Sequence, residues 1–246
     1  MHDKYGVTEE DFLSAELELV PACKPREAGL DRSMILGYGQ DDRVCAYAGL
    51  RALVDIKGIP EYTATALLCD KEEIGSVGAT GMASNFFENT SAELLNLTTD
   101  SYSELALKRA LNNSWMISAD VNALFDPLYA SVSEKKNSAI LNHGVCLSKY
   151  GGSRGKSGSS DASAEFVAEI RRIFDKAGVI WQTGELGKVD QGGGGTIAWL
   201  MARYGMHVVD CGVGLLSMHS PMELAGKLDI YMAYKAYLAF LKDGRK

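Results

Sequence analysis

The sequence lacks the features typical of membrane-spanning, secreted and nucleic-acid-binding proteins. None of its 246 residues belongs to an apolar run that approaches the roughly 18 residues of a transmembrane helix. Its start, MHDKYGVTEEDF, contains no apolar segment of a secretory signal. The formal net charge of −7 disfavours nucleic acids and anionic membranes, which attract basic surfaces. We therefore expect a cytoplasmic protein with neither of these partners.

Paired cysteines are also missing. The chain has five cysteines, an odd number, with no CxxC pair and no Cys/His cluster at structural-zinc spacing. They are Cys23, Cys45, Cys69, Cys146 and Cys211. We interpret them as reduced thiols that lie mostly in the core.

Helix and strand patterns alternate from Asp41 onward. Apolar spacing and β-branched runs predict strands at 63–69, 115–120, 144–150, 179–184 and 206–214. Helices are predicted at 41–56, 100–114, 159–178, 194–205 and 220–243. This alternation predicts a three-layer α/β/α sandwich with a mostly parallel sheet.

Two segments depart from this alternation. Residues 15–22, AELELVPA, alternate apolar and polar side chains like a half-buried strand, and the turn-like CKPREAGLDRS follows them. A single strand without a hairpin partner is not a stable beginning for a domain. Residues 151–163, GGSRGKSGSSDAS, are of low complexity and are predicted to form a mobile loop.

Acidic side chains collect where predicted strands end and helices begin. Glu72 and Glu73 follow the strand at 63–69, Asp120 ends another strand, and Asp41 precedes a helix. His219 lies in a loop before the last helix. Taken singly, each has an ordinary explanation: a solvated turn, a helix cap or a structural histidine. Together, at the sheet edge where ligands bind, they indicate a site for Zn²⁺, with Mn²⁺ or Co²⁺ as alternatives.

The adjacent glutamates suit a site with two metal ions. Two close ions need a bridging carboxylate, further ligands on each side, and a carboxylate outside the ligand set that accepts a proton from water. Neighbouring side chains are aimed differently by the chain, so one of Glu72 and Glu73 can bind metal while the other holds the water.

Five motifs in order resemble the M18 family of metalloaminopeptidases, the aspartyl aminopeptidase and aminopeptidase I family, and within it the bacterial branch. They are GYGQDDRVCAY, CDKEEIGSVGATG, SADVNALFDP, GGSRGKSGSSDASAEF and LLSMHSPMELAG, and the similarity runs from about residue 8 to 241. The resemblance implies a zinc-exopeptidase-like fold and hydrolysis of peptides at a free N-terminus. It further implies assembly as a homo-oligomer, a dodecamer in full-length members.

The resemblance also implies a role for each residue of the acidic set. Asp41 would bridge two zinc ions, Glu72 would be the general base, and Glu73 and His219 would bind one ion. Asp120 would bind the other ion.

Substrate contacts are expected from four further residues. Acid-preferring members carry histidines shortly after the metal-binding aspartate, whereas this chain has Asp126 there, which disfavours acidic N-terminal residues. Lys149 is either a contact for an acidic side chain or a surface lysine. Gly192 and Gly193 belong to a glycine run without the lysine of a phosphate-binding loop, so we place their backbone beside the substrate cleft.

The chain departs from the family pattern in length and in one ligand. Family members are nearly twice as long, with an inserted dimerisation domain, so we predict that residues 1–30 are a remnant of that domain. Residues 31–246 would then be the C-terminal part of the catalytic domain, without its N-terminal part. The first half of the family sequence carries a histidine ligand that nothing here obviously replaces, since His143 and His207 lie elsewhere and His2 lies at the start of the chain.

Three functional interpretations follow from these departures. The first is a dinuclear zinc aminopeptidase, impaired in this chain by the absent histidine segment. The second is a non-catalytic structural or interaction remnant. The third, which the motifs disfavour, is a related hydrolase acting on carboxyl-terminal or acyl-amino substrates.

Overall fold

The fold is organised around a mixed four-stranded sheet. The computed structural model describes residues 1–154, 156–188 and 190–244. The strands of this sheet, in spatial order, are β3 (Trp115–Ser118), β9 (His207–Gly212), β5 (Val145–Ser148) and β8 (Trp181–Thr183). The β3–β9 and β5–β8 pairs are parallel, and the β9–β5 pair is antiparallel.

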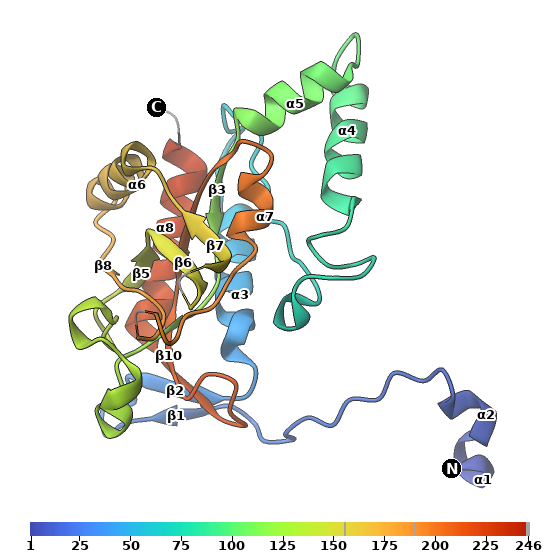
Figure 1. Cartoon of the computed structure of the whole chain (residues 1–246), viewed down its shortest axis with the longest axis vertical. Coiled ribbons are helices and arrows are strands. Elements are labelled where there is room, and N and C mark those ends of the chain that lie inside the picture. The colour runs from blue at the N-terminus through green and yellow to red at the C-terminus, as the bar shows by residue number, and fades with distance from the viewer. Residues whose placement is uncertain (155, 189, 245–246) are drawn as a thin grey trace.

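Alternating side chains along these strands divide the interior into two cores. On β9, Val209 and Cys211 join one cluster, whereas Val208 joins the other. On β3, Ile117 and Met116 divide in the same way. The first cluster is completed by the helices α3 (Gln40–Val54), α6 (Ala164–Lys176) and α8 (Lys227–Asp243), and the second by α5 (Glu104–Asn112) and α7 (Ala198–Ala202). Helices on both faces of one sheet confirm the predicted three-layer α/β/α sandwich (Figure 1).

Local signals account for two of the predicted helices. The Ser163 side chain accepts a hydrogen bond from the Phe166 N–H and caps α6, and Ser103 caps α5 by accepting from the Ala106 N–H. Each helix buries an apolar stripe at helical spacing, with Ile170 and Ile173 fully buried on α6. Capping and amphipathic spacing thus act on the same segments.

A second sheet stands beside the first and is mostly antiparallel. Its five strands, in spatial order, are β1 (Arg26–Ala28), β2 (Met34–Gly37), β11 (Glu223–Gly226), β10 (Gly214–Leu216) and β4 (Asn122–Ala123). Only the β10–β4 pair is parallel. The predicted predominance of parallel pairs therefore applies to the four-stranded sheet alone.

The N-terminal segment contains no strand where residues 15–22 predicted one. It forms the short helices α1 (His2–Tyr5) and α2 (Glu9–Phe12) and then runs as an extended arm away from the body (Figure 1). The prediction was wrong because a strand needs a partner strand, and no described strand pairs with this segment, in which Leu19 is 98% exposed. The turn-like stretch after it contains β1. The division into residues 1–30 and 31–246 stays a prediction.

Three other local predictions also differ from the structure. Residues 63–69 form no strand, since their backbone pairs with no described strand, although Leu67 and Cys69 pack on the second core. The predicted loop at 151–163 contains the antiparallel strands β6 (Tyr150–Ser153) and β7 (Ser157–Asp161). The helix predicted from Ser220 begins only at Lys227, because pairing of residues 223–226 with both β2 and β10 overrides their helix propensity.

The remaining elements are short or lie outside the predicted pattern. They are α4 (Phe86–Thr98) and the 3₁₀ turns η1 (Glu72–Ile74), η2 (Pro127–Val132) and η3 (Lys135–Asn137). In the part of the chain that the structure describes, no helix combines the length and the apolar character needed to cross a bilayer. All five cysteines are free; only Cys23 is exposed, and Cys69 is half-buried.

Candidate metal centre

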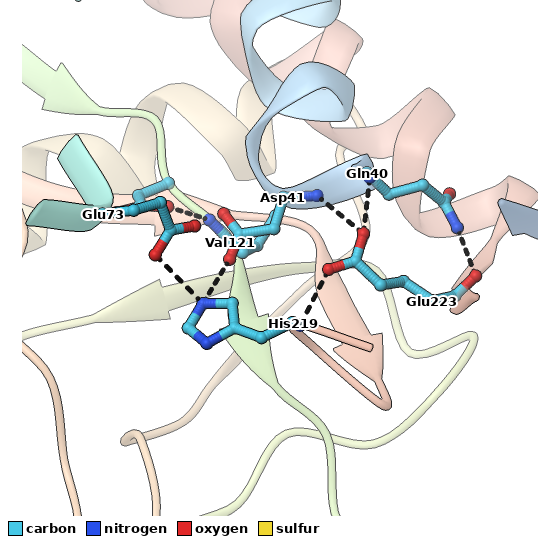
Figure 2. Close-up of polar contacts among 7 residues, drawn as sticks. Gln40, Asp41, Glu73, Val121, His219 and Glu223 are labelled. Carbon is cyan, nitrogen blue, oxygen red and sulfur yellow. Dashed lines mark hydrogen bonds and ion pairs between the residues drawn. The ribbon is translucent and has the colours of Figure 1, made fainter. Parts of the chain in front are cut away.

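Asp41, Glu73 and His219 converge on one point from three separate segments. Asp41 lies in the first turn of α3, Glu73 lies on η1, and His219 lies in the loop between β10 and β11. The His219 Nε2 atom lies 2.9 Å from Asp41 Oδ2 and 3.2 Å from Glu73 Oε2 (Figure 2). The Asp41 side chain is 9% exposed and the His219 side chain 62%, so the cluster opens to solvent on the histidine side.

The loop that carries the two glutamates is held in a fixed shape by its backbone. Lys71 and Gly75, on either side of η1, adopt left-handed conformations with φ of 64° and 93°. Ser76 N–H donates to the Lys71 carbonyl, and the Ser76 carbonyl accepts from Ala83 N–H. A Cβ atom on Gly81 would lie 2.3 Å from the Ser76 carbonyl oxygen, so only glycine permits this closure.

A second cluster shares Asp41 with the first. It joins Asp41, Asp42 and Asp120, and in each cluster one potential ligand atom per residue lies within 4.8 Å of the others. Asp120 follows β3, and its Oδ1 accepts a hydrogen bond from the Val121 N–H at 2.8 Å. A Cβ atom on Gly212 of β9 would lie 1.7 Å from the Asp120 carbonyl oxygen, so a glycine is required where β9 passes this residue.

Burial and the repulsion between neighbouring carboxylates raise the pKa values of the acids in these clusters. Burial, then the charge of Glu73, raises the pKa of Asp41 to about 7, although His219 opposes the shift. Burial, then Asp120, raises the pKa of Asp42 to about 9. The pKa of Asp120 is raised well above its ordinary value by burial and by Glu72 and Asp41, and that of Glu72 is raised by burial and Glu73. A bound cation would supply the positive charge that lets these groups ionise.

The residues present fit a divalent metal of the zinc type. The Oδ1 atom of Asp42 is buried and has no hydrogen-bond partner among the described residues, which is costly for a carboxylate oxygen unless a bound ligand supplies one. Carboxylate oxygens with one imidazole nitrogen form a donor set that suits Zn²⁺ and Mn²⁺.

The structure brings together four of the predicted site residues as neighbours, namely Asp41, Glu73, Asp120 and His219. Glu72 lies close enough to influence Asp120 electrostatically and precedes Glu73 on the same turn. The other histidines do not join the clusters. His143 contacts the Leu141 carbonyl, and the ring of His207 packs against those of Trp115 and Phe166.

The predicted substrate residues occupy different surroundings. Asp126 caps η2 by accepting a hydrogen bond from the Leu128 N–H at 2.8 Å. Lys149 forms an ion pair with Asp161 at 2.5 Å, and both side chains are about half exposed.

One residue of the glycine run lies beside the acidic region. Gly194 lines a cavity that Asp120 also lines, and Gly192 and Gly193 line a neighbouring one. A Cβ atom on Gly193, where φ is 97°, would lie 2.3 Å from the Gly152 carbonyl oxygen, so this run passes directly along β6.

Sequence reasoning missed three acids of this region, of which Asp210 and Glu223 are buried. Asp42 is not among the predicted ligands, although it directly follows Asp41 in the sequence. Asp210, inside the strand β9, lines the Asp120 cavity and accepts a hydrogen bond from Thr196 Oγ1 at 2.7 Å; an acid within a buried run was its signal. Glu223, which is 2% exposed, gave no local signal because it occupied a predicted helix.

The fold and the clusters together define a class: an α/β protein with a candidate metal site of carboxylates and one histidine beside the carboxyl end of β3. A family model described as "Aminopeptidase I zinc metalloprotease (M18)" matches residues 1–241. The chain therefore belongs to the M18 family of zinc aminopeptidases, as the motifs predicted.

Relatives and solved structures agree with this assignment. The chain is 57% identical over 243 residues to a probable M18 family aminopeptidase 1 of Clostridium acetobutylicum, covering 99% of this chain and 52% of the relative. The crystal structure of aminopeptidase I from that organism superposes with a TM-score of 0.90 at 55% identity, covering 98% of this chain and 52% of that one. An M18 aminopeptidase structure from Thermotoga maritima gives 0.94 at 48% identity, covering 98% and 53%. The chain thus spans about half the length of these relatives.

Proposed function

We propose that this chain carries the C-terminal part of the catalytic centre of a dinuclear zinc aminopeptidase. The observation that carries this proposal is the membership of Asp41 in both clusters of potential ligand atoms. A carboxylate shared between two clusters is the arrangement that two close metal ions require. Family membership supports zinc as the metal, and the two-ion site is our inference from the geometry.

The roles of the side chains follow from their positions. Asp41 would bridge the two ions, Glu73 and His219 would hold one of them, and Asp120 would hold the other, with Asp42 as a further carboxylate in the second cluster. Zinc bound there supplies the polarisation of the scissile carbonyl and the lowered pKa of the attacking water.

Glu72 is assigned as the general base. It belongs to neither ligand cluster, yet it shares η1 with Glu73 and interacts electrostatically with Asp120. Burial, and then the charge of Glu73, raises the pKa of the Glu72 carboxyl, which moves it towards the range where a base accepts and returns protons near neutral pH.

The substrates are peptides with a free N-terminus, and we infer a preference for neutral or hydrophobic first residues. Membership of an aminopeptidase family supports a free α-amine on the substrate. Lys149 is already paired with Asp161, so an acidic substrate side chain would have to compete with that carboxylate for the lysine. Homo-oligomeric assembly and a cytoplasmic location stay predictions.

The assignment is tested by measuring zinc content and hydrolysis on the same samples. The wild-type chain, Glu72→Gln and Asp41→Asn are dialysed against dilute zinc, analysed for bound metal, and assayed with leucyl and aspartyl amides. Glu93→Gln, on the exposed surface of α4, is the matched control for the loss of one charge.

We expect Asp41→Asn to lose most of its zinc and Glu72→Gln to retain it, with leucyl amide hydrolysis abolished in both. Equal loss of zinc from both variants would contradict the division of roles. If the wild-type chain binds no zinc, the interpretation as a non-catalytic remnant is favoured instead, because the two clusters would then not be metal sites.

A further inference from the structure

Glu223 is a buried carboxylate whose hydrogen bonds all go to backbone groups of the candidate site. Its Oε2 atom accepts from the Gln40 N–H at 2.5 Å and from the Asp41 N–H at 3.1 Å, and its Oε1 accepts from the His219 N–H at 2.9 Å (Figure 2). The Gln40 side-chain amide donates in turn to the Glu223 carbonyl at 2.6 Å. A carboxylate that is 2% exposed is costly to bury unless such donors satisfy it.

The two segments that Glu223 holds have little regular structure of their own at these points. Asp41 has non-helical backbone angles although it stands in the first turn of α3, and Gly39 at the N-cap has no side chain to satisfy the free N–H groups there. His219 adopts a left-handed conformation with φ of 64° in the loop after β10. The Glu223 carboxylate therefore caps α3 from a distant strand and fixes the histidine loop with its other oxygen.

We propose that Glu223 is a positioning residue that sets the separation of Asp41 and His219, so that both side chains face one metal ion. This inference rests on the proposed function. One carboxylate accepts hydrogen bonds from the backbone N–H groups of both residues. Their side chains also contact each other, with His219 Nε2 2.9 Å from Asp41 Oδ2. Without the Glu223 carboxylate, both backbone segments would lose these hydrogen bonds. Metal binding would then have to order the side chains of Asp41 and His219.

The chemistry of the link requires a carboxylate and not an amide. Three N–H donors converge on its two oxygen atoms, so each oxygen accepts at least one of the bonds. Glutamine at 223 retains one oxygen and turns an NH₂ group towards at least one N–H donor, which breaks either the α3 side or the His219 side of the link. Losses of groups that orient metal ligands typically weaken metal binding by about 10–100-fold.

Asp229 provides a matched control. It is another fully buried carboxylate that accepts backbone N–H groups, from Asn142 at 2.8 Å and Gly144 at 2.7 Å, but it holds the segment before β5 and none of the ligands. Asp229→Asn and Glu223→Gln therefore impose similar penalties on folding, and only Glu223→Gln disturbs the ligand geometry.

The experiment measures zinc affinity by competition with a chromophoric chelator, together with thermal unfolding in the presence of EDTA. We expect Glu223→Gln to weaken zinc binding about 10–100-fold and Asp229→Asn to change it less than about threefold, although both lower the unfolding temperature of the metal-free chain. Equal zinc affinity for Glu223→Gln and wild type would overturn the proposal, as would equal weakening by both variants. If the wild-type chain itself binds no zinc, the proposed function fails.

Amide hydrogen exchange on the metal-free wild-type chain tests the positioning independently of any variant and of zinc binding. The N–H groups of Asp41 and His219 should exchange as slowly as those of the β9–β5 ladder, because both donate to a buried carboxylate. Exchange at the rate of an open loop would refute the link even if Glu223→Gln failed to fold.

Discussion

Replacing Asp42 by asparagine should stabilise the metal-free chain at neutral pH while weakening its metal site. The Asp42 carboxyl is held neutral in the folded chain because burial, and then Asp120, raises its pKa to about 9, whereas the carboxyl of an unfolded chain titrates near 3.8. Between these values the folded chain binds one more proton than the unfolded chain. The contribution of Asp42 to the free energy of unfolding is therefore highest below pH 4 and falls as the pH rises.

The size of the effect follows from the width of that pH window. Each carboxyl kept neutral costs about 1.4 kcal/mol of stability per pH unit, so Asp42 should remove about 3 kcal/mol between pH 5 and pH 7. Asp41, with a pKa raised to about 7, adds a second contribution in the same direction. Because relaxation and water entry reduce such penalties, we expect Asp42→Asn to recover about 1–3 kcal/mol of this loss.

Urea unfolding in EDTA at pH 5, 6 and 7 measures this difference. The wild-type chain should lose stability more steeply than Asp42→Asn, and the two should converge near pH 4, where both side chains are neutral. Asp100→Asn, at an exposed position, controls for the loss of one acid. Added zinc should then stabilise wild type more than the variant. Parallel pH profiles, or an asparagine variant that is less stable at pH 7, would refute the reasoning.

Two further predictions concern packing around the site. Gly212→Ala forces a methyl group to within 1.7 Å of the Asp120 carbonyl, so it should cost at least about 1–3 kcal/mol in urea unfolding and weaken zinc binding. A Cβ atom on Gly49 of α3 would have no neighbouring atom within 4 Å, so Gly49→Ala should raise the free energy of unfolding by up to about 1 kcal/mol. Equal destabilisation by Gly212→Ala and Gly49→Ala would contradict the steric explanation. Tyr237→Phe removes the 2.8 Å hydrogen bond from the buried hydroxyl to the Cys211 carbonyl, and it should lower the free energy of unfolding by about 1–2 kcal/mol with unchanged zinc affinity. Unchanged stability would show that this hydrogen bond does not stabilise the fold.

The sequence by itself determined the features that depend on neighbouring residues. The capped, amphipathic segments that became α5 and α6 were predictable because capping and helical spacing are local. The positions of Asp41, Glu73 and Asp120 beside turns and strand ends were visible in the same way. Their chemical types, with His219, indicated a metal centre before any distance was known.

The tertiary structure alone decided how those segments meet. Residues 63–69 have the composition of a strand but pair with no described strand. Residues 223–226 were predicted as helix but form a strand that pairs with two others, β2 and β10. Glu223 binds the Gln40 N–H across 183 positions of sequence, a contact that no local periodicity encodes. A buried backbone N–H group can be satisfied by any acceptor that the fold places beside it, however distant in sequence. For this reason the sequence could indicate the candidate ligands but not Glu223, whose carboxylate holds the backbone of Asp41 and His219.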